Sequence, residues 1–184
     1  MQFVGKKNSL TPKLISMPFK RVTMDAKKAD LLIKSIKSVN LGETTMDFIN
    51  VIQSEVEGYE GEHAELITQS PGLYRLLTRL LDDPNLPGRL RPLVILAIAY
   101  FILPNDIMPE DLSGAANYAD DIFLAAFITD QVRKDLENGN ILTDNWDGER
   151  DVLTLIDEIL GQEAGLIGDR RELILWYIGY EYVC

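Results

Sequence analysis

Two long apolar runs dominate the middle of the chain. The first spans residues 93–103, the second runs from about residue 120 to 132, and the segment between them is rich in Pro, Asp, Asn and Gly. Each run is longer than a typical strand, which favours a helix, and Pro104 cannot continue the first one. The pattern therefore predicts two buried helices joined by a rigid acidic loop.

Weaker amphipathic patterns on both sides of this hairpin predict further helices. Apolar residues recur at helical spacing in four segments, 24–39, 45–56, 62–81 and 144–160. The Ser70-Pro71-Gly72 sequence predicts a break within the third of them. The last apolar stretch follows Asp169, which has the spacing of an N-cap in a capping box, and a short buried helix is favoured there, although periodicity alone leaves a strand open. The expected fold is all-α, a compact multi-helix domain centred on the hairpin.

Charge is divided unevenly along the sequence. Residues 1–40 hold nine Lys/Arg and two Asp, a net charge of +7, whereas residues 41–184 hold nine Lys/Arg and 27 Asp/Glu, a net charge of −18. Residues 1–23 carry no acid and no clear periodicity, so we expect a basic, partly disordered arm ahead of a single helical domain over 24–184. The cations that would meet an anionic surface are Lys6, Lys7, Lys13, Lys20, Arg21, Lys27, Lys28, Lys34 and Lys37. The alternative is that the arm folds back onto the acidic body and neutralises it.

The composition, with 46% hydrophobic and 26% charged residues, is that of an ordinary globular protein. The lone Cys184 excludes an intramolecular disulfide and a site built from several thiolates. The run over 92–103 is shorter than the ~20 residues that a membrane-spanning helix needs. A cytoplasmic location is expected, with peripheral membrane contact through the basic residues, and the acidic body makes nucleic acid an unfavourable partner.

The acidic loop has a complete structural interpretation. Asp106 follows a proline and can form an Asx-type turn, and Pro109 with Glu110 suits the first turn of a short helix. Asn117 and Asp120 have the spacing of an N-cap and its N3 partner. In this interpretation the carboxylates are caps and turn formers, and no cofactor is needed.

The same carboxylates permit two other interpretations. The first is a site for a hard cation such as Mg2+ or Ca2+, which prefers oxygen ligands, built by Asp106, Glu110, Asp120 and Asp121. The second is an ion pair across the hairpin between one of the last two acids and Arg89 or Arg91. No phosphate-binding loop, nucleophile elbow or His-Glu-x-x-His motif is present, so the sequence names no catalytic residue.

The loop and its flanks carry a recognisable pattern. It reads Tyr100-x-x-x-Pro104-x-Asp106-x-x-Pro109-Glu110, followed by Gly114 and then Tyr118-x-Asp120-Asp121. Over about residues 86–132 the pattern resembles the YkvA-like family of domains of unknown function. Two positions differ: Glu110 stands where that family usually has Asp, and Ala115-Ala116-Asn117 separates Gly114 from Tyr118. The resemblance implies a small helical domain that is sometimes associated with membranes, and it implies no established reaction.

Two functional hypotheses follow from these features. The preferred one is a non-enzymatic helical interaction or scaffold protein, whose basic N-terminal region contacts an unknown protein partner or an anionic membrane surface. The alternative is a divalent-metal-dependent enzyme or sensor that uses the four loop carboxylates.

Overall fold

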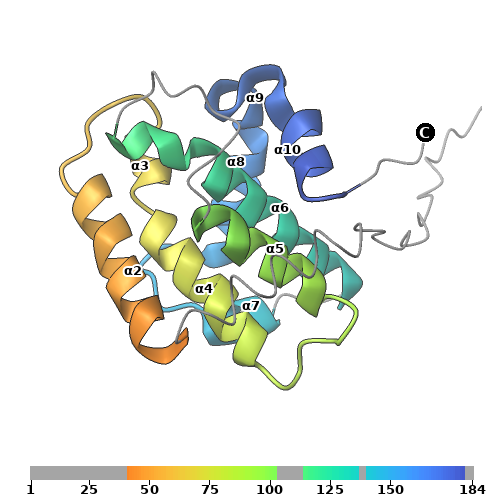
Figure 1. The fold of residues 1–184 in the computed structure, drawn as a ribbon. Helices are drawn as coiled ribbons and strands as arrows, with labels where there is room; N and C mark the ends of the chain where they lie inside the picture. Colours follow the sequence, from red (N-terminus) through yellow and green to blue (C-terminus); the bar gives the residue numbers. More distant parts are fainter. Residues whose placement is uncertain (1–40, 103–113, 137–139, 181–184) are drawn as a thin grey trace, which may run out of the picture.

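The computed structural model describes residues 41–102, 114–136 and 140–180, which fold into helices with short connections (Figure 1). No strand occurs in these three ranges, and the all-α prediction is confirmed. The elements are α2 (Leu41–Val56), α3 (Ala64–Ile67), α4 (Ser70–Asp82), α5 (Arg91–Ile102), the 3-10 helix η1 (Gly114–Tyr118), α6 (Ala119–Asp135), α7 (Asn140–Asn145), α8 (Val152–Gly161), α9 (Glu163–Leu166), the 3-10 helix η2 (Gly168–Arg170) and α10 (Arg171–Tyr177). The predicted basic arm and the helix over 24–39 lie outside the described residues.

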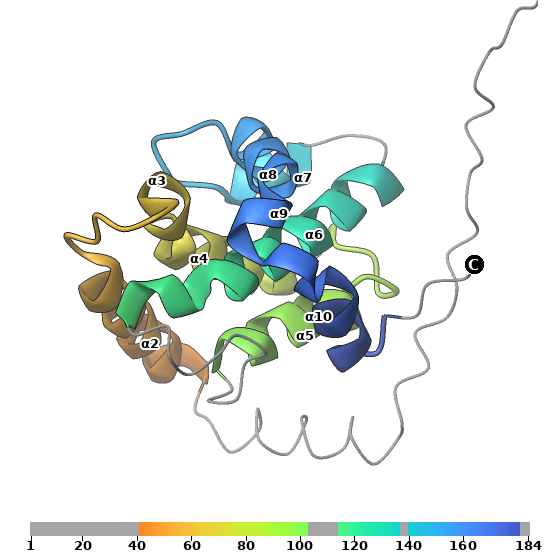
Figure 2. The ribbon, with the colours of Figure 1, turned by 90° about the horizontal axis from the view of Figure 1, so that it is seen from above.

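Helices α4, α5 and α6 form the centre of the molecule. They pack against one another, while α2 packs on α4 and α8 packs on α6. Helices α2 and α10 lie on opposite sides of these central helices (Figures 1 and 2). Helix α5 is apolar around its whole circumference, and almost every residue from Leu93 to Phe101 is buried. A helix of this kind belongs in a core, as the first apolar run predicts.

Helix α4 follows the amphipathic pattern of its sequence. Its apolar face is buried and comprises Leu73, Leu76, Leu77 and Leu80. On the other face Arg75 and Arg79 bind Asp147, with nitrogen–oxygen distances of 3.1 and 2.7 Å. Burial alone would raise the pKa of Asp147, but the hydrogen bonds and charges of the two guanidinium groups outweigh it and lower that pKa. The ion pairs thus tie α4 to the segment that follows α7.

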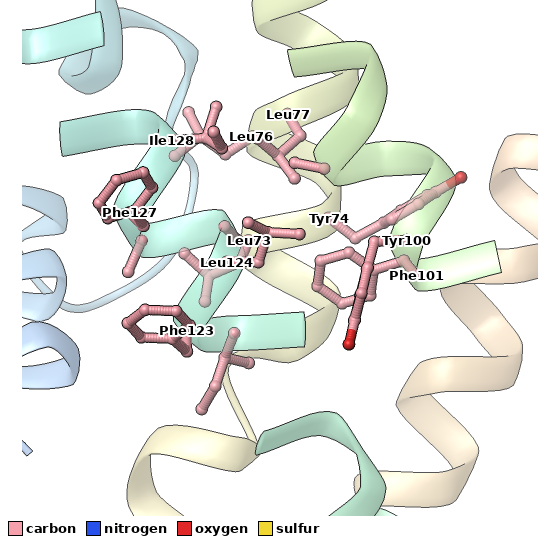
Figure 3. Close-up of a cluster of buried hydrophobic side chains, with 14 of the residues drawn as sticks. Leu73, Tyr74, Leu76, Leu77, Tyr100, Phe101, Phe123, Leu124, Phe127 and Ile128 are labelled. Carbon is pink, nitrogen blue, oxygen red and sulfur yellow. The ribbon is translucent and has the colours of Figure 1, made fainter. Parts of the chain in front are cut away.

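A line of aromatic rings joins α2, α4 and α5. The Tyr74 ring lies edge-on to Phe48 and to Phe101, with centroid distances of 5.1 and 5.4 Å. Each such pair contributes about 0.5–1.5 kcal/mol beyond the burial of its area. Figure 3 shows Tyr74 and Phe101 among the other core side chains. Burial raises the pKa of Tyr74 to about 12, so its hydroxyl stays protonated at neutral pH.

The predicted break in the 62–81 segment is confirmed. Helix α3 ends at Ile67 and α4 starts at Ser70, with Pro71 in the first turn, where its missing N–H costs no hydrogen bond. Gly72 has a separate role, because a Cβ atom there would lie only 2.9 Å from the Trp146 ring. The indole can approach α4 closely only because position 72 is glycine.

The single helix predicted over 144–160 is wrong. Helix α7 ends at Asn145, and α8 begins after Asp151, whose carboxylate caps it by accepting a 2.8 Å hydrogen bond from the N–H of Thr154. Between them Trp146 packs on Gly72, and its Nε1 donates to the carbonyl of Arg150 at 2.7 Å. This long-range contact fixes a non-helical connection that the local periodicity does not reveal.

The last apolar stretch is helical over α10, as favoured. The predicted cap is wrong, because Asp169 lies within η2 and Arg170 precedes α10 without a side-chain cap. Burial of Ile174 and Leu175 against the core holds this short helix in place.

A matched pair of leucine substitutions tests the core. We expect Leu124→Ala to lower the free energy of unfolding by about 2–5 kcal/mol, because Leu124 is 0% exposed and its removal leaves a cavity. Leu173→Ala removes the same atoms from a side chain that is 50% exposed and should have a much smaller effect. Urea unfolding of both variants measures the difference, and equal losses would contradict this arrangement of the core.

Candidate functional site

The candidate site lies where α5 ends and α6 begins, at the two ends of the acidic loop. Residues 103–113 lie outside the described residues, and with them the predicted site residues Pro104, Asp106, Pro109 and Glu110. Gly114 opens η1. The remaining predicted residues, Tyr100, Tyr118, Asp120 and Asp121, are described and lie at this junction.

A buried hydrogen bond joins the two helices of the hairpin. The hydroxyl of Tyr100, near the end of α5, donates to Oδ2 of Asp120, in the first turn of α6, at 2.6 Å. This length is typical of a hydroxyl bound to a carboxylate. Tyr100 is 3% exposed and Asp120 is 0% exposed, so water does not compete for the bond. The structure therefore brings together two residues of the motif that the sequence separates by a loop.

A second tyrosine–carboxylate bond lies beside the first. The hydroxyl of Tyr118, at the end of η1, donates to Oε2 of Glu55 on α2. Burial raises the pKa of Tyr118, and the hydrogen bond to Glu55 and the negative charges of Glu55 and Asp121 raise it further. Tyr118 therefore remains a neutral donor, and it ties the start of α6 to α2.

The carboxylates at the start of α6 are not the caps that the sequence predicts. Tyr118, rather than Asn117, is the N-cap residue, and its side chain makes no capping hydrogen bond. Asp120 and Asp121 lie inside the first turn, where negative charge interacts favourably with the helix dipole. Asp121 is also buried. The predicted cap at Asn117 is therefore wrong, while a structural role for both acids remains.

The alternative ion pair across the hairpin is also wrong. Arg89 binds Asp135, at the other end of α6, at 2.5 Å. Arg91 donates to the carbonyls of Leu81 and Asp83, which are left without helical partners at the end of α4. Both arginines consequently brace the α4–α5 connection, away from the start of α6.

Two residues at this junction carry no signal in the sequence. Glu55 lies in a different helix from the motif, and Tyr177, on α10, packs edge-on against Tyr100 with ring centroids 5.8 Å apart. Both are brought in by tertiary packing, so spacing within the motif could not reveal them.

Within the described ranges, no group of three or more His, Cys, Asp and Glu side chains has an arrangement suited to a metal ion. Two of the four predicted ligands, Asp106 and Glu110, lie outside these ranges. The metal site thus stays a prediction. Of its four predicted ligands, Asp120 and Asp121 lie within the described residues.

Comparison with known proteins finds a family model that matches part of the chain, and it gives no activity. Residues 91–127 match a family described as protein of unknown function, DUF1232. The match is to a domain of unknown function. The matched segment includes α5 and the start of α6, and so contains the Tyr100–Asp120 pair.

One relative extends beyond this segment. The chain is similar to the uncharacterized protein ORF9 of Methanothermobacter thermautotrophicus, with 23% identity over 133 residues, which cover 72% of this chain and 90% of that protein. No solved structure matches the chain significantly. The similarity therefore supports a family of domains of unknown function and names no substrate or partner.

Removal of the Tyr100 hydroxyl tests the central hydrogen bond. We expect Tyr100→Phe to destabilise the protein by about 1–3 kcal/mol, because a buried carboxylate loses a donor that water cannot replace. Tyr59→Phe is the matched control, since the Tyr59 hydroxyl donates to the Glu62 carbonyl at the surface. Urea unfolding should show little change in the control. If the two variants unfold alike, the Tyr100–Asp120 bond does not stabilise the hairpin.

Proposed function

We propose that this protein is a non-enzymatic helical module that attaches to anionic membrane surfaces through its basic N-terminal residues. The observation that carries the proposal is the division of charge, +7 over residues 1–40 and −18 over residues 41–184. A basic residue close to an anionic bilayer contributes about 1 kcal/mol. The nine N-terminal cations would therefore supply an attraction to such a surface that opposes the repulsion between that surface and the acidic body.

The described part of the chain supports a scaffold role for the hairpin. Tyr100 and Tyr118 both use their hydroxyls in internal hydrogen bonds, to Asp120 and to Glu55. The YkvA-like resemblance of the hairpin adds weight, because members of that family are sometimes associated with membranes. No helix in the described ranges is long and apolar enough to cross a bilayer. The proposal requires only contact with the bilayer surface.

Vesicle binding by full-length variants tests this proposal. We expect the chain to sediment with vesicles that contain phosphatidylserine and not with neutral phosphatidylcholine vesicles. Replacement of Lys27, Lys28, Lys34 and Lys37 by Gln should weaken binding at least tenfold, because about 1 kcal/mol is lost for each contact. The same four positions changed to Arg keep the charge and should keep the binding.

Each outcome has a distinct meaning. Equal binding by the Gln and Arg variants would show that the basic region does not make the contact. No binding to anionic vesicles by the unchanged chain would end the membrane proposal and leave an acidic protein surface as the target of the basic residues.

A divalent-cation site at the loop is the second candidate. It is favoured by the position of Asp120 and Asp121, two neighbouring buried carboxylates next to the loop that contains Asp106 and Glu110. Carboxylate oxygens are the ligands that Mg2+ and Ca2+ prefer, and bound metal would relieve the repulsion between adjacent acids.

Thermal unfolding separates this candidate from the scaffold role. If the site exists, millimolar Mg2+ or Ca2+ should raise the melting temperature relative to EDTA, because a ligand that binds only the folded state stabilises it. Asp121→Asn should abolish that rise, whereas Asp135→Asn, at the far end of α6, should preserve it. A melting temperature that is the same with metal and with EDTA would exclude the site.

A further inference from the structure

A cavity of about 330 Å3 lies between the second half of α6 and the α8–α10 region, away from the junction where α5 ends and α6 begins. Its walls come from Phe127, Asp130 and Lys134 on one face of α6, from Glu163 on α9, from Arg171 on α10 and from Tyr180. In Figure 2, α6, α9 and α10 lie next to one another on the side of the molecule opposite α2. Its volume is at the small end of the range for ligand pockets, which is about 300–1,000 Å3.

The charged residues of the cavity balance. Asp130 and Glu163 are negative and Lys134 and Arg171 are positive, on a chain whose net charge is −11. Asp130 is only 3% exposed and binds Lys134 at 2.5 Å and Arg133 at 2.6 Å. Glu163 forms an ion pair with Arg171. A singly charged ligand that contacted all four side chains would therefore meet two charges of its own sign and two of the opposite sign.

The cavity also has an aromatic wall. The Phe127 and Tyr180 rings meet edge-on with centroids 5.1 Å apart, and the Arg171 guanidinium carbon lies 5.5 Å from the Phe127 centroid. This stacking on the ring, together with the ion pair to Glu163, gives the guanidinium a defined position. Lys134 is different: its side chain is 65% exposed, so it can turn away from Asp130 at little cost.

We infer that this cavity binds a small zwitterion, a molecule that carries an ammonium group, a carboxylate and an apolar side chain, such as an apolar amino acid. The ligand carboxylate binds Arg171 and Lys134, and the ammonium group takes the place of the Lys134 ammonium on the buried Asp130. The apolar side chain rests on Phe127 and Tyr180. The buried Asp130 then keeps two cationic partners, Arg133 and the ligand ammonium, whereas a simple anion that draws Lys134 away leaves it with Arg133 alone.

Calorimetric titration of the full-length protein tests the inference. L-phenylalanine and L-leucine are the probes, used up to about 10 mM so that dissociation constants in the millimolar range can be measured. We expect at least one of them to bind. 3-Phenylpropionate lacks the ammonium group, and 2-phenylethylamine lacks the carboxylate. Each of these analogues should bind at least tenfold more weakly than the amino acid that binds more tightly.

Variants locate the binding. Lys134→Gln, at an exposed side chain that the fold does not need, should weaken amino acid binding severalfold, and Arg171→Gln should weaken it at least tenfold. Arg89→Gln is the control, because it breaks the comparable Arg89–Asp135 ion pair on α6 outside the cavity, and it should leave binding unchanged.

Three results would overturn the inference. They are no heat of binding with either amino acid, equal binding of the singly charged analogues, and equal affinities of the Lys134→Gln and Arg89→Gln variants.

Discussion

The buried carboxylate of Asp120 sets the constraint that the centre of this fold satisfies. Taking a carboxylate out of water costs several kcal/mol unless hydrogen bonds replace the lost hydration. The Tyr100 hydroxyl supplies one such bond, and it comes from the neighbouring helix rather than from α6 itself. The bond therefore fixes how α5 and α6 are aligned. Tyr177 extends this dependence to α10, because its ring packs edge-on against the Tyr100 ring.

Local patterns in the sequence were sufficient for the elements whose side chains face a single core. The leucine face of α4 is one example, because its burial repeats at the helical period. Helix α5 is another, because its continuous apolar run is buried around the whole circumference. Prediction failed where a distant residue decides the backbone. Trp146 needs the space at Gly72, and this contact ends α7 early and separates it from α8. No window of local sequence contains both residues.

The candidate site was predictable to a similar extent. Motif spacing identified Tyr100 and Asp120, which do meet, since both lie close to the ends of their helices. The sequence also suggested Arg89 or Arg91 as a partner for these carboxylates. Instead, Arg91 caps a carbonyl at the end of α4, and Arg89 binds Asp135 at the other end of α6. Glu55 could not be found, because its partnership with Tyr118 arises only when α2 packs beside η1. Spacing within the motif thus brought Tyr100 and Asp120 to attention, whereas the partners of Arg89, Arg91 and Tyr118 depend on tertiary packing.

The two proposed surfaces rest on different electrostatics. In the proposed membrane attachment, the basic N-terminal region would act through its net charge, and this attraction would be screened by salt over a Debye length of about 8 Å at physiological ionic strength. The cavity beside Asp130 carries no net charge and offers nothing at long range. Its proposed discrimination would come from the positions of opposite charges around a buried carboxylate, where screening by ions is weak. Attachment and recognition can therefore operate on the same chain without competing, because one depends on how much charge is present and the other on where it lies.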